Sequence, residues 1–409
     1  MAGRRQDGPV ISPECVAAAA GRPAPLVVVD LAAFDANAAE LLRRSHGRPV
    51  RLATKSVRVP ALIERALSLG FDGLMTYSVR EAAWWAHHGA DDVLVGYPSA
   101  DVGALADALA DPATRAAVTF MVDDVAHLAL LDRAREAARV GDAVVRVCLD
   151  VDASLRVGPR WAGRRRAHLG VRRSPLREPA EVAALAREAR RRGVVVRGLM
   201  FYEAQVAGLP DSSPAVRAVK RASLAELAER RGAVVAAVAG AVGHGLELVN
   251  GGGTGSLEQT AADASVTELT SGSGLLAPTL FDGYRLRPGA RPLRPAAFLA
   301  FDVVRRPAPG VATLFSGGYL ASGPVGPTRA PTPVWPRGLR LSRSEGAGEV
   351  QTPVHGGAAD QLAVGDRVWF RHAKAGEVME RFAEVVLVGP EPDAVTVAPT
   401  YRGLGLTFG

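Results

Sequence analysis

Short runs of apolar residues recur along the first two thirds of the chain, and their regular spacing constrains the fold more than any other feature. Most runs are continuous rather than alternating, as expected of strands that are buried on both faces. Between several of them, apolar residues recur at three- and four-residue spacing and the pattern stops at glycine, which predicts helices. The eight predicted strands are 50–55, 73–78, 92–98, 118–124, 143–152, 194–203, 246–253 and 266–272, and the clearest helices are 60–70, 79–90, 125–141 and 179–193.

This alternation predicts an α/β fold in which residues 31–284 form a (β/α)8 TIM-type barrel. A doubly wound open sheet is the alternative, because a count of strands does not prove that a sheet closes. We prefer the barrel because eight strand–helix units over roughly 230 residues fit its repeat. In such a barrel, the residues that follow the carboxyl ends of the strands supply the chemistry.

The pattern changes after residue 285, where the Pro/Arg-rich connector "LRPGARPLRP" begins at Leu286. Long helical patterns disappear, and short strand-like runs separated by turn residues predict a smaller β domain. The run "APLVVVD" (24–30) is an extra strand that we expect to join this domain. The second domain is therefore predicted to comprise residues 1–30 and 285–409, and residues 153–174 are interpreted as a loop insertion in the barrel.

Composition excludes several classes of protein. The chain has 409 residues, of which 48% are hydrophobic and 22% charged, as is typical of a globular protein. Its net charge of +7 does not favour a nucleic-acid partner, because the arginines are interspersed with acidic residues and form no stripe with aromatic residues. No apolar run is long enough for a membrane span, and no convincing signal peptide is present. With only two cysteines, a cytoplasmic protein is expected.

Lysine is scarce in this chain, and the position of one lysine is informative. Only Lys55, Lys220 and Lys374 are lysines, although Lys and Arg together number 49. Lys55 ends the first predicted barrel strand, where barrel enzymes carry reactive groups. Unlike a guanidinium group, its amine can lose a proton and form an imine with an aldehyde. The alternative is a lysine that merely extends from a strand end into solvent.

Two glycine-rich segments follow the seventh and eighth predicted strands. They are "VNGGGTGSL" (249–257) and "TSGSG" (270–274). Glycines let the backbone approach an anion, and Thr254, Ser271 and Ser273 add hydroxyl donors. Barrel enzymes often bind phosphate in the loops after strands seven and eight. Pyridoxal phosphate, a phosphorylated aldehyde, would use both an imine-forming lysine and such a phosphate site.

With these motifs the chain resembles the fold-type III pyridoxal phosphate enzymes, which combine an alanine racemase-like barrel with a β domain. It is most similar to the D-threonine aldolase and D-serine dehydratase branch, and particularly to proteins described as amino acid deaminase/aldolase. The resemblance runs over nearly the whole chain. It is carried by "LATKSVR" (52–58), "GLMFYEAQVAG" (198–208), "NGGGTGS" (250–256), "ELTSGSG" (268–274), "FRHAKAGEVMERF" (370–382) and "PTYRG" (399–403).

The resemblance implies roles for individual residues. Lys55 would hold the cofactor covalently, and Tyr202 would face the cofactor unless it is simply a core tyrosine. Arg156 would be the partner of the pyridine nitrogen, although His168 or Arg172 could serve instead. The residues expected to bind the phosphate are Gly253, Thr254, Gly272 and Ser273.

The C-terminal motif departs from the pattern of this branch. The branch usually presents a histidine and, two residues later, an aspartate or cysteine as ligands of a divalent metal. This chain has His372 and then Lys374. Because an ammonium group is a poor metal ligand, a metal is doubtful, although His372 could bind one. We expect Lys374 to replace the positive charge of the metal, unless it is a solvated loop lysine, and His372 to act as acid or base, with Glu203 as a further catalytic candidate.

The resemblance predicts a lyase that cleaves a β-hydroxy-α-amino acid, expected to have the D configuration, into glycine and an aldehyde. The alternatives are a dehydratase that releases a keto acid and ammonia, an amino-acid racemase, and a non-catalytic pyridoxal phosphate-binding protein. A barrel enzyme acting on phosphorylated sugars is a more distant alternative. A homodimer is expected from the architecture, and neither nucleic acid nor a membrane is expected as a partner.

Overall fold

The computed structural model describes residues 11–158, 167–324, 326–391 and 394–409. Its sheet topology confirms the predicted barrel and rules out the open sheet: eight parallel strands close in the order β10-β11-β2-β3-β4-β5-β6-β9. All eight predicted strands are present. They are β2 (Val50–Ala53), β3 (Leu74–Thr76), β4 (Val93–Val95), β5 (Val118–Val122), β6 (Val145–Asp150), β9 (Val194–Phe201), β10 (Leu248–Gly251) and β11 (Glu268–Ser271).

The described residues form two compact units. One contains 41–54, 70–271 and 408–409, and therefore holds every strand of the barrel. The other contains 11–40, Lys55–Leu69 and Gly272–Thr407. The domain limits predicted from the sequence, 31–284 against 1–30 and 285–409, remain a prediction, and residues 1–10 lie outside the described part of the chain.

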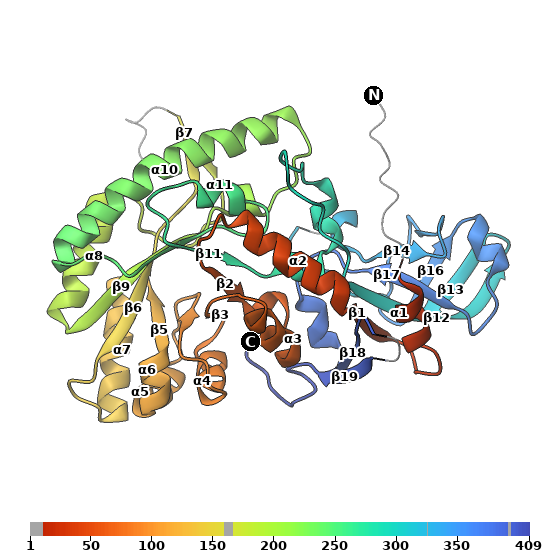
Figure 1. Cartoon of the computed structure of the whole chain (residues 1–409), viewed down its shortest axis with the longest axis horizontal. Coiled ribbons are helices and arrows are strands. Elements are labelled where there is room, and N and C mark those ends of the chain that lie inside the picture. The colour runs from red at the N-terminus through yellow and green to blue at the C-terminus, as the bar shows by residue number, and fades with distance from the viewer. Residues whose placement is uncertain (1–10, 159–166, 325, 392–393) are drawn as a thin grey trace. The chain divides into compact units, whose positions relative to one another are not determined.

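Helices accompany the barrel strands (Figure 1). The four helices predicted from the sequence are confirmed, with shorter limits. They are α3 (Pro60–Ser68), α4 (Val79–His87), α7 (Val125–Ala138) and α8 (Pro179–Arg191). The remaining helices are α1 (Pro13–Ala18), α2 (Leu31–Arg44), α5 (Val102–Ala110), α6 (Pro112–Ala117), α9 (Ala204–Ala207), α10 (Pro214–Val242), α11 (Leu257–Ala261) and α12 (Ser273–Leu276).

The longest helix, α10, was not predicted. It lies beside α8 (Figure 1) and begins after the N-cap Ser213, with proline in its first turn. It ends at Gly243, whose φ of 84° lies in the left-handed region. Among the described residues, no helix is long and apolar enough to cross a membrane.

The interior of the barrel is closely packed. Leu94, Met121, Cys148, Met200 and Leu248 form one buried cluster, with one residue from each of five strands. Gly198 lets β9 and β10 approach, because a Cβ at this position would lie 2.0 Å from the carbonyl oxygen of Leu248. Continuous apolar strands are therefore required by burial on both faces, as the sequence indicated.

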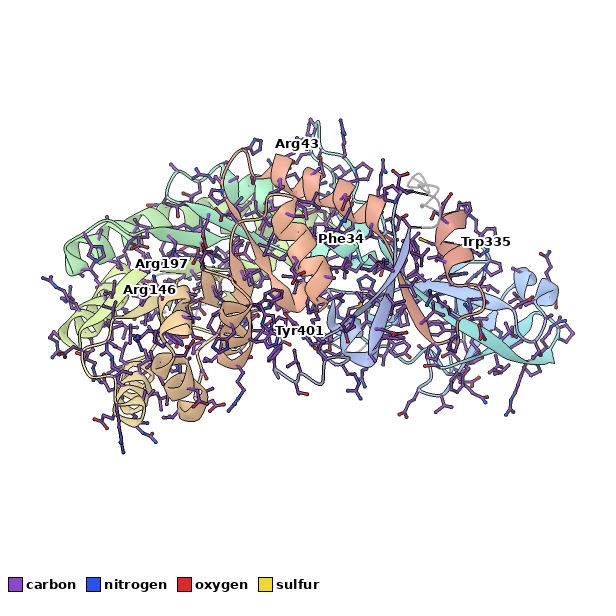
Figure 2. The ribbon with its side chains drawn as sticks, turned by 60° about the horizontal axis from the view of Figure 1, so that its bottom comes forward. Phe34, Arg43, Arg146, Arg197, Trp335 and Tyr401 are labelled. Atoms are coloured by element: carbon purple, nitrogen blue, oxygen red, sulfur yellow. The ribbon has the colours of Figure 1, made fainter. Side chains whose placement is uncertain are left out.

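An ionic network fills the amino-terminal half of the barrel. Arg51 in β2 binds both carboxylate oxygens of Glu268 in β11 at 2.9 Å, and it binds Asp92 at 2.6 Å. Arg197 in β9 also binds Asp92, at 2.5 Å. Figure 2 labels Arg197 and Arg146, which come from the paired strands β9 and β6. Almost fully buried, Arg51 depends on these carboxylates to balance its charge.

The second unit contains the predicted β domain, a nine-stranded sheet in which β15-β16-β13-β12-β1-β18-β19 are consecutive and β14 and β17 extend from β12. The run 24–30 joins this sheet as predicted: β1 (Leu26–Asp30) pairs antiparallel with β12 and parallel with β18. The other strands are β12 (Ala297–Ala308), β13 (Val311–Phe315), β14 (Thr332–Trp335), β15 (Arg340–Leu341), β16 (Gln351–His355), β17 (Arg367–Arg371), β18 (Glu384–Val388) and β19 (Val395–Pro399).

The interpretation of 153–174 as a loop was incomplete. Two short strands, β7 (Leu155–Val157) and β8 (Ala167–Leu169), pair antiparallel to form a hairpin. Each has only three residues, too few for a clear period of two. The intervening residues 159–166 lie outside the described part of the chain.

Candidate active site

The residues predicted to bind the cofactor follow four strands that are neighbours in the closed barrel, β9, β10, β11 and β2. These strands are parallel, so the chain leaves all four at the same end of the barrel. Such segments carry the active site in barrel enzymes. The residues are Tyr202 after β9, Gly253 and Thr254 after β10, Gly272 and Ser273 after β11, and Lys55 after β2.

Lys55 lies in a single 3-10 turn, Thr54–Ser56, directly after β2. The Ser56 hydroxyl lies 3.0 Å from the Ser273 hydroxyl, so the segments that follow β2 and β11 are joined by a hydrogen bond. The Lys55 carbonyl oxygen accepts a hydrogen bond of 3.2 Å from the Arg58 guanidinium. Lys55 itself is half-buried. Hydrogen bonds from Arg58 and to Ser273 therefore hold the turn that carries Lys55.

The segment after β10 is bound to the end of β11. The Thr254 hydroxyl lies 2.9 Å from the hydroxyl of Ser271, the last residue of β11. A Cβ added to Gly253 would lie 2.9 Å from the Cβ of Ala207 and 3.4 Å from the Tyr202 ring. Only glycine fits this position without displacing its neighbours, and two hydroxyl groups are held beside it.

Tyr202 is a neutral phenol in this environment. Burial raises its pKa to about 12, against an opposing effect of the nearby charge of Arg173. The Arg173 guanidinium lies 5.3 Å from the centre of the Tyr202 ring and 5.6 Å from that of Tyr97. Both distances are within the range of cation–π contacts. Tyr202 can therefore donate a hydrogen bond, but its ring is already part of a packed cluster.

The motif that contains His372 and Lys374 follows β17 in the second unit. His372 has 2% of its surface exposed, and burial, assisted by the charge of Arg371, lowers its pKa to about 3. Neither ring nitrogen has a hydrogen-bond partner among the described residues. The Lys374 ammonium donates to the Ser322 carbonyl oxygen at 3.3 Å. His372 is thus a neutral imidazole, whereas Lys374 is a cation within hydrogen-bond distance of the backbone.

This motif packs directly on the Lys55 segment, within one unit. A Cβ added to Gly376 would lie 2.4 Å from the Ser56 carbonyl oxygen, so Gly376 contacts the residue next to Lys55. Arg58 forms an ion pair of 2.8 Å with Glu380. The Tyr401 amide (Figure 2) donates to the Arg58 carbonyl oxygen at 3.1 Å. The sequence motifs around Lys55, Lys374 and Tyr401 therefore meet in space.

Glu203 follows Tyr202 and is fully buried. Its carboxylate accepts hydrogen bonds from the Gly252 amide at 3.2 Å, from the Ser256 hydroxyl at 2.9 Å and from the Thr260 hydroxyl. Both oxygens are thus bound to the segment after β10. The catalytic role suggested for Glu203 from the sequence stays a prediction, and the contacts favour a different role.

The three candidates for the pyridine-nitrogen partner lie on or beside the β7–β8 hairpin. Arg156 in β7 donates to the buried Asp152 carboxylate at 3.0 Å, and its cross-strand partner is His168 in β8. One ring nitrogen of His168 lies 3.2 Å from the Val171 carbonyl oxygen. Arg172 is exposed. These contacts do not identify one of the three residues as the partner of the pyridine nitrogen, so the assignment of Arg156 stays a prediction.

Two acidic residues at strand ends were not singled out from the sequence. Asp150 ends β6, and Asp123 directly follows β5. Burial, together with the negative charge of Asp123, raises the pKa of Asp150 to about 7. His127 lies 3.1 Å from Asp123, and this hydrogen bond raises the pKa of its imidazole. Both aspartates were visible as charged residues at the ends of apolar runs, which is the signal that identified Lys55.

Comparison with known proteins relates the whole arrangement to one group of enzymes. No family model matches the chain. A D-threonine aldolase from Arthrobacter sp. is 28% identical over 309 residues, which are 74% of each chain. The crystal structure of D-threonine aldolase from Filomicrobium marinum has a TM-score of 0.76 and 22% identity, covering 93% of this chain and 96% of the other.

Two further structures extend this likeness. D-threo-3-hydroxyaspartate dehydratase from Delftia sp. HT23 has a TM-score of 0.71 and 18% identity, covering 93% of this chain and 98% of the other. An alanine racemase-like protein from Idiomarina loihiensis has a TM-score of 0.68 and 12% identity, covering 93% and 97%. The predicted resemblance is confirmed, and the chain has the fold-type III architecture of barrel and β domain.

Proposed function

We propose that this chain, which shares its fold with D-threonine aldolase and D-threo-3-hydroxyaspartate dehydratase, is a pyridoxal phosphate-dependent lyase of β-hydroxy-α-amino acids. Retro-aldol cleavage to glycine and an aldehyde is the reaction we favour. The observation that carries the proposal is the position of Lys55. It follows a barrel strand whose neighbour, β11, leads into the hydroxyl- and glycine-rich segment that binds Ser56.

The residues fit the phosphorylated cofactor. Gly253 is packed against Ala207 and the Tyr202 ring, so only glycine fits there, and glycine-rich loops of this kind can bring their backbone close to an anion. Two hydroxyl pairs, Thr254 with Ser271 and Ser56 with Ser273, supply donors. Pyridoxal phosphate, when bound, would withdraw electrons from the substrate's amino carbon. Lys55 would hold it covalently, and Gly253, Thr254, Gly272 and Ser273 would bind its phosphate.

Three side chains of the protein, those of Lys55, Tyr202 and His372, can contribute to the reaction. The Lys55 amine can take up and return a proton when the substrate amine displaces it. The Tyr202 phenol, which stays protonated, can donate a hydrogen bond at the carboxyl end of β9. The neutral His372 imidazole can accept a hydrogen bond from the substrate's β-hydroxyl group and so orient it.

The His372 motif does not fit a divalent metal site. The branch that the sequence resembles places a second ligand two residues after the histidine, but Lys374 occupies that position. In the described ranges, no group of three or more His, Cys, Asp or Glu side chains is arranged to hold a metal ion. In our proposal the Lys374 ammonium supplies the positive charge instead, and it attracts the carboxylate or β-oxygen of the substrate.

Dehydration is the second candidate function. It is favoured by the fold shared with D-threo-3-hydroxyaspartate dehydratase over 93% of this chain. In that reaction the amino-carbon proton and the β-hydroxyl group leave as water, and the enamine product is then hydrolysed by water to a keto acid and ammonia. The same lysine and phosphate-binding residues would serve both reactions, so the site geometry alone does not separate them. The assembly that we expect is a homodimer, and the compartment is the cytoplasm.

The test is an absorbance spectrum of the purified protein with pyridoxal phosphate, followed by turnover of D- and L-β-hydroxy amino acids with and without a chelator. We expect a band of covalently bound cofactor, aldehyde release from a D substrate, and the same rate with chelator present. Ammonia in place of aldehyde would favour the dehydratase. Isomerisation of the substrate's amino carbon would indicate a racemase, and a cofactor band without product from any substrate would indicate a non-catalytic binding protein.

A further inference from the structure

Glu203 is a buried carboxylate whose side-chain hydrogen bonds, among the described residues, all come from one loop. The loop runs from Gly252 to Thr260 between β10 and the end of helix α11, and we call it the glycine loop. One carboxylate oxygen accepts the Gly252 amide, and the other accepts the Ser256 and Thr260 hydroxyl groups. Because these residues are about 50 positions from Glu203 in sequence, only the pairing of β9 with β10 brings them together.

A second hydrogen bond extends this contact to the predicted phosphate-binding residue. The Gly253 amide donates to the Ser256 hydroxyl oxygen at 3.1 Å, and the Ser256 hydroxyl donates to Glu203 at 2.9 Å. Glu203 thus fixes the amide of Gly252 directly and that of Gly253 through Ser256. Since two successive backbone amides are oriented by one carboxylate, the geometry of the loop depends on this side chain.

A guanidinium group outside the glycine loop, that of Arg231, lies near the carboxylate of Glu203 and compensates its charge. Arg231 in α10 has 2% of its surface exposed, and its Nη2 lies 3.9 Å from a Glu203 carboxylate oxygen. Arg231 also forms an ion pair with Asp263, which follows the glycine loop. A buried carboxylate with three hydrogen-bond donors and a nearby guanidinium is stabilised where it is. Its hydrogen bonds therefore go to the protein itself.

We propose that Glu203 is a positioning residue that sets the glycine loop for the phosphate group of the cofactor, and that it is not an acid–base catalyst. This inference rests on the proposed function, because it takes the glycine loop as the phosphate site. The reason is structural: both oxygens of Glu203 are used by the loop, and the side chain is fully buried. Its effect should therefore appear in recognition of the phosphate rather than in the chemical step.

Glu203→Gln is the appropriate change, since it keeps the shape of the side chain. The amide nitrogen of glutamine cannot accept the hydrogen bonds that the Ser256 and Thr260 hydroxyls donate, so these hydroxyls must reverse their hydrogen bonds, and the negative charge beside Arg231 is lost. We expect the Kd for pyridoxal phosphate, measured by absorbance titration, to rise about 10-fold to 100-fold. The Kd for pyridoxal, which lacks the phosphate, should change less than about 3-fold, because its binding does not use the loop.

Three further variants separate this role from general destabilisation. Ser256→Ala should raise the Kd for pyridoxal phosphate by a smaller factor, and combining it with Glu203→Gln should add little, because both act on Gly253. Thr260→Val removes a different donor and replaces Glu203→Gln if that variant does not fold. Glu247→Gln is the control, because this carboxylate is exposed and pairs with Arg197 rather than with the loop.

The results separate this inference from the proposed function. Natural protein that fails to bind pyridoxal phosphate would reject both. If the natural protein binds it and folded Glu203→Gln binds it equally well, the positioning role alone is rejected. Unchanged affinity together with lost turnover would instead establish Glu203 as a catalytic residue. An equal loss of affinity for pyridoxal and pyridoxal phosphate would also contradict us, because it would show that the effect is not on the phosphate site.

Discussion

The two ends of the barrel use polar residues in opposite ways. In the amino-terminal half, Arg51, Arg197, Asp92 and Glu268 bind one another at 2.5 to 2.9 Å. After the carboxyl ends of the strands, hydroxyl groups and glycines predominate, as at Thr254 and Gly253. Charged groups at the first end neutralise each other inside the barrel. At the second end, the Thr254 and Ser271 hydroxyls bind each other, and Glu203 accepts hydrogen bonds from uncharged donors.

The pKa shifts of three buried residues illustrate the difference. Burial alone would raise the pKa of Asp92, but Arg51 and Arg197 outweigh it and lower the pKa, so this residue stays charged. At the other end, burial raises the pKa of Asp150 to about 7 and that of Tyr202 to about 12, which favours the neutral forms. The comparison teaches that one end is built for stability and the other for binding and proton transfer.

Replacing Lys55 should have the largest effect on activity. It should leave stability nearly unchanged, as expected for a residue at the binding end of the barrel. We expect Lys55→Met to lower turnover by about 10,000-fold or more, because the covalent attachment of the cofactor is lost. Its free energy of unfolding should stay within about 1 kcal/mol of the natural value, since Lys55 is only half-buried and methionine keeps most of its apolar stem. Turnover and urea unfolding measure the two quantities. Lys220→Arg, which keeps the charge that pairs with Asp211, is the matched control and should retain activity.

Replacing Arg51 should give the reverse pattern. Arg51→Met leaves Glu268 without its buried guanidinium partner and Asp92 with Arg197 alone, which should cost about 3–5 kcal/mol of unfolding free energy. The exposed pair of Arg80 and Asp101 is the control, and Arg80→Met should cost less than about 1 kcal/mol. Urea unfolding followed by circular dichroism gives both values. Equal small losses in the two variants would contradict the assignment of a stabilising role to this end.

Replacing Lys374 tests the charge at the proposed substrate site. If its ammonium replaces a metal, Lys374→Met should lower kcat/KM for a D-β-hydroxy amino acid by about 10-fold to 100-fold. The natural enzyme should be indifferent to chelator. Initial rates with and without chelator provide the measurement. Unchanged kcat/KM in this variant would show that Lys374 is a solvated loop lysine, and inhibition of the natural enzyme by chelator would show that a metal is used.

The smallest effect concerns the pH dependence of stability. Because the folded pKa of Asp150 is about 7 and the ordinary value is 3.8, the folded chain keeps a proton that the unfolded chain loses between these pH values. The free energy of unfolding therefore falls as the pH rises through this range. Asp150→Asn removes this loss, so its Tm relative to the natural protein should rise by about 2–4 °C between pH 5 and pH 8. Parallel Tm curves would contradict the raised pKa.

Much of the fold could be predicted because burial on both faces leaves a continuous apolar pattern in the barrel strands. The prediction failed where this signal is weak. Helix α10 contains Gly232 and Gly240, which interrupt its pattern. Strand β15 has two residues and β14 contains a proline, so neither resembles an ordinary strand. The hairpin of β7 and β8 is too short to show a period.

The sequence was sufficient to predict those parts of the candidate site that depend only on position along the chain. Lys55 and the two glycine segments could be placed because each follows a predicted strand. The partners of Glu203 could not, because Ser256 and Thr260 become its neighbours only when β9 pairs with β10. The pKa of Asp150 depends on burial and on Asp123, which a linear sequence does not give. The covalent attachment itself is still a proposal.

Borohydride reduction of the protein loaded with pyridoxal phosphate, followed by peptide mapping, tests the central claim most directly. The chain has only three lysines, so the attachment site is identified by a choice between Lys55, Lys220 and Lys374. We predict that the reduced cofactor is found on Lys55 at about one equivalent per chain. Recovery of the cofactor on Lys220 or Lys374, or on no lysine at all, would contradict this account of the carboxyl end of the barrel.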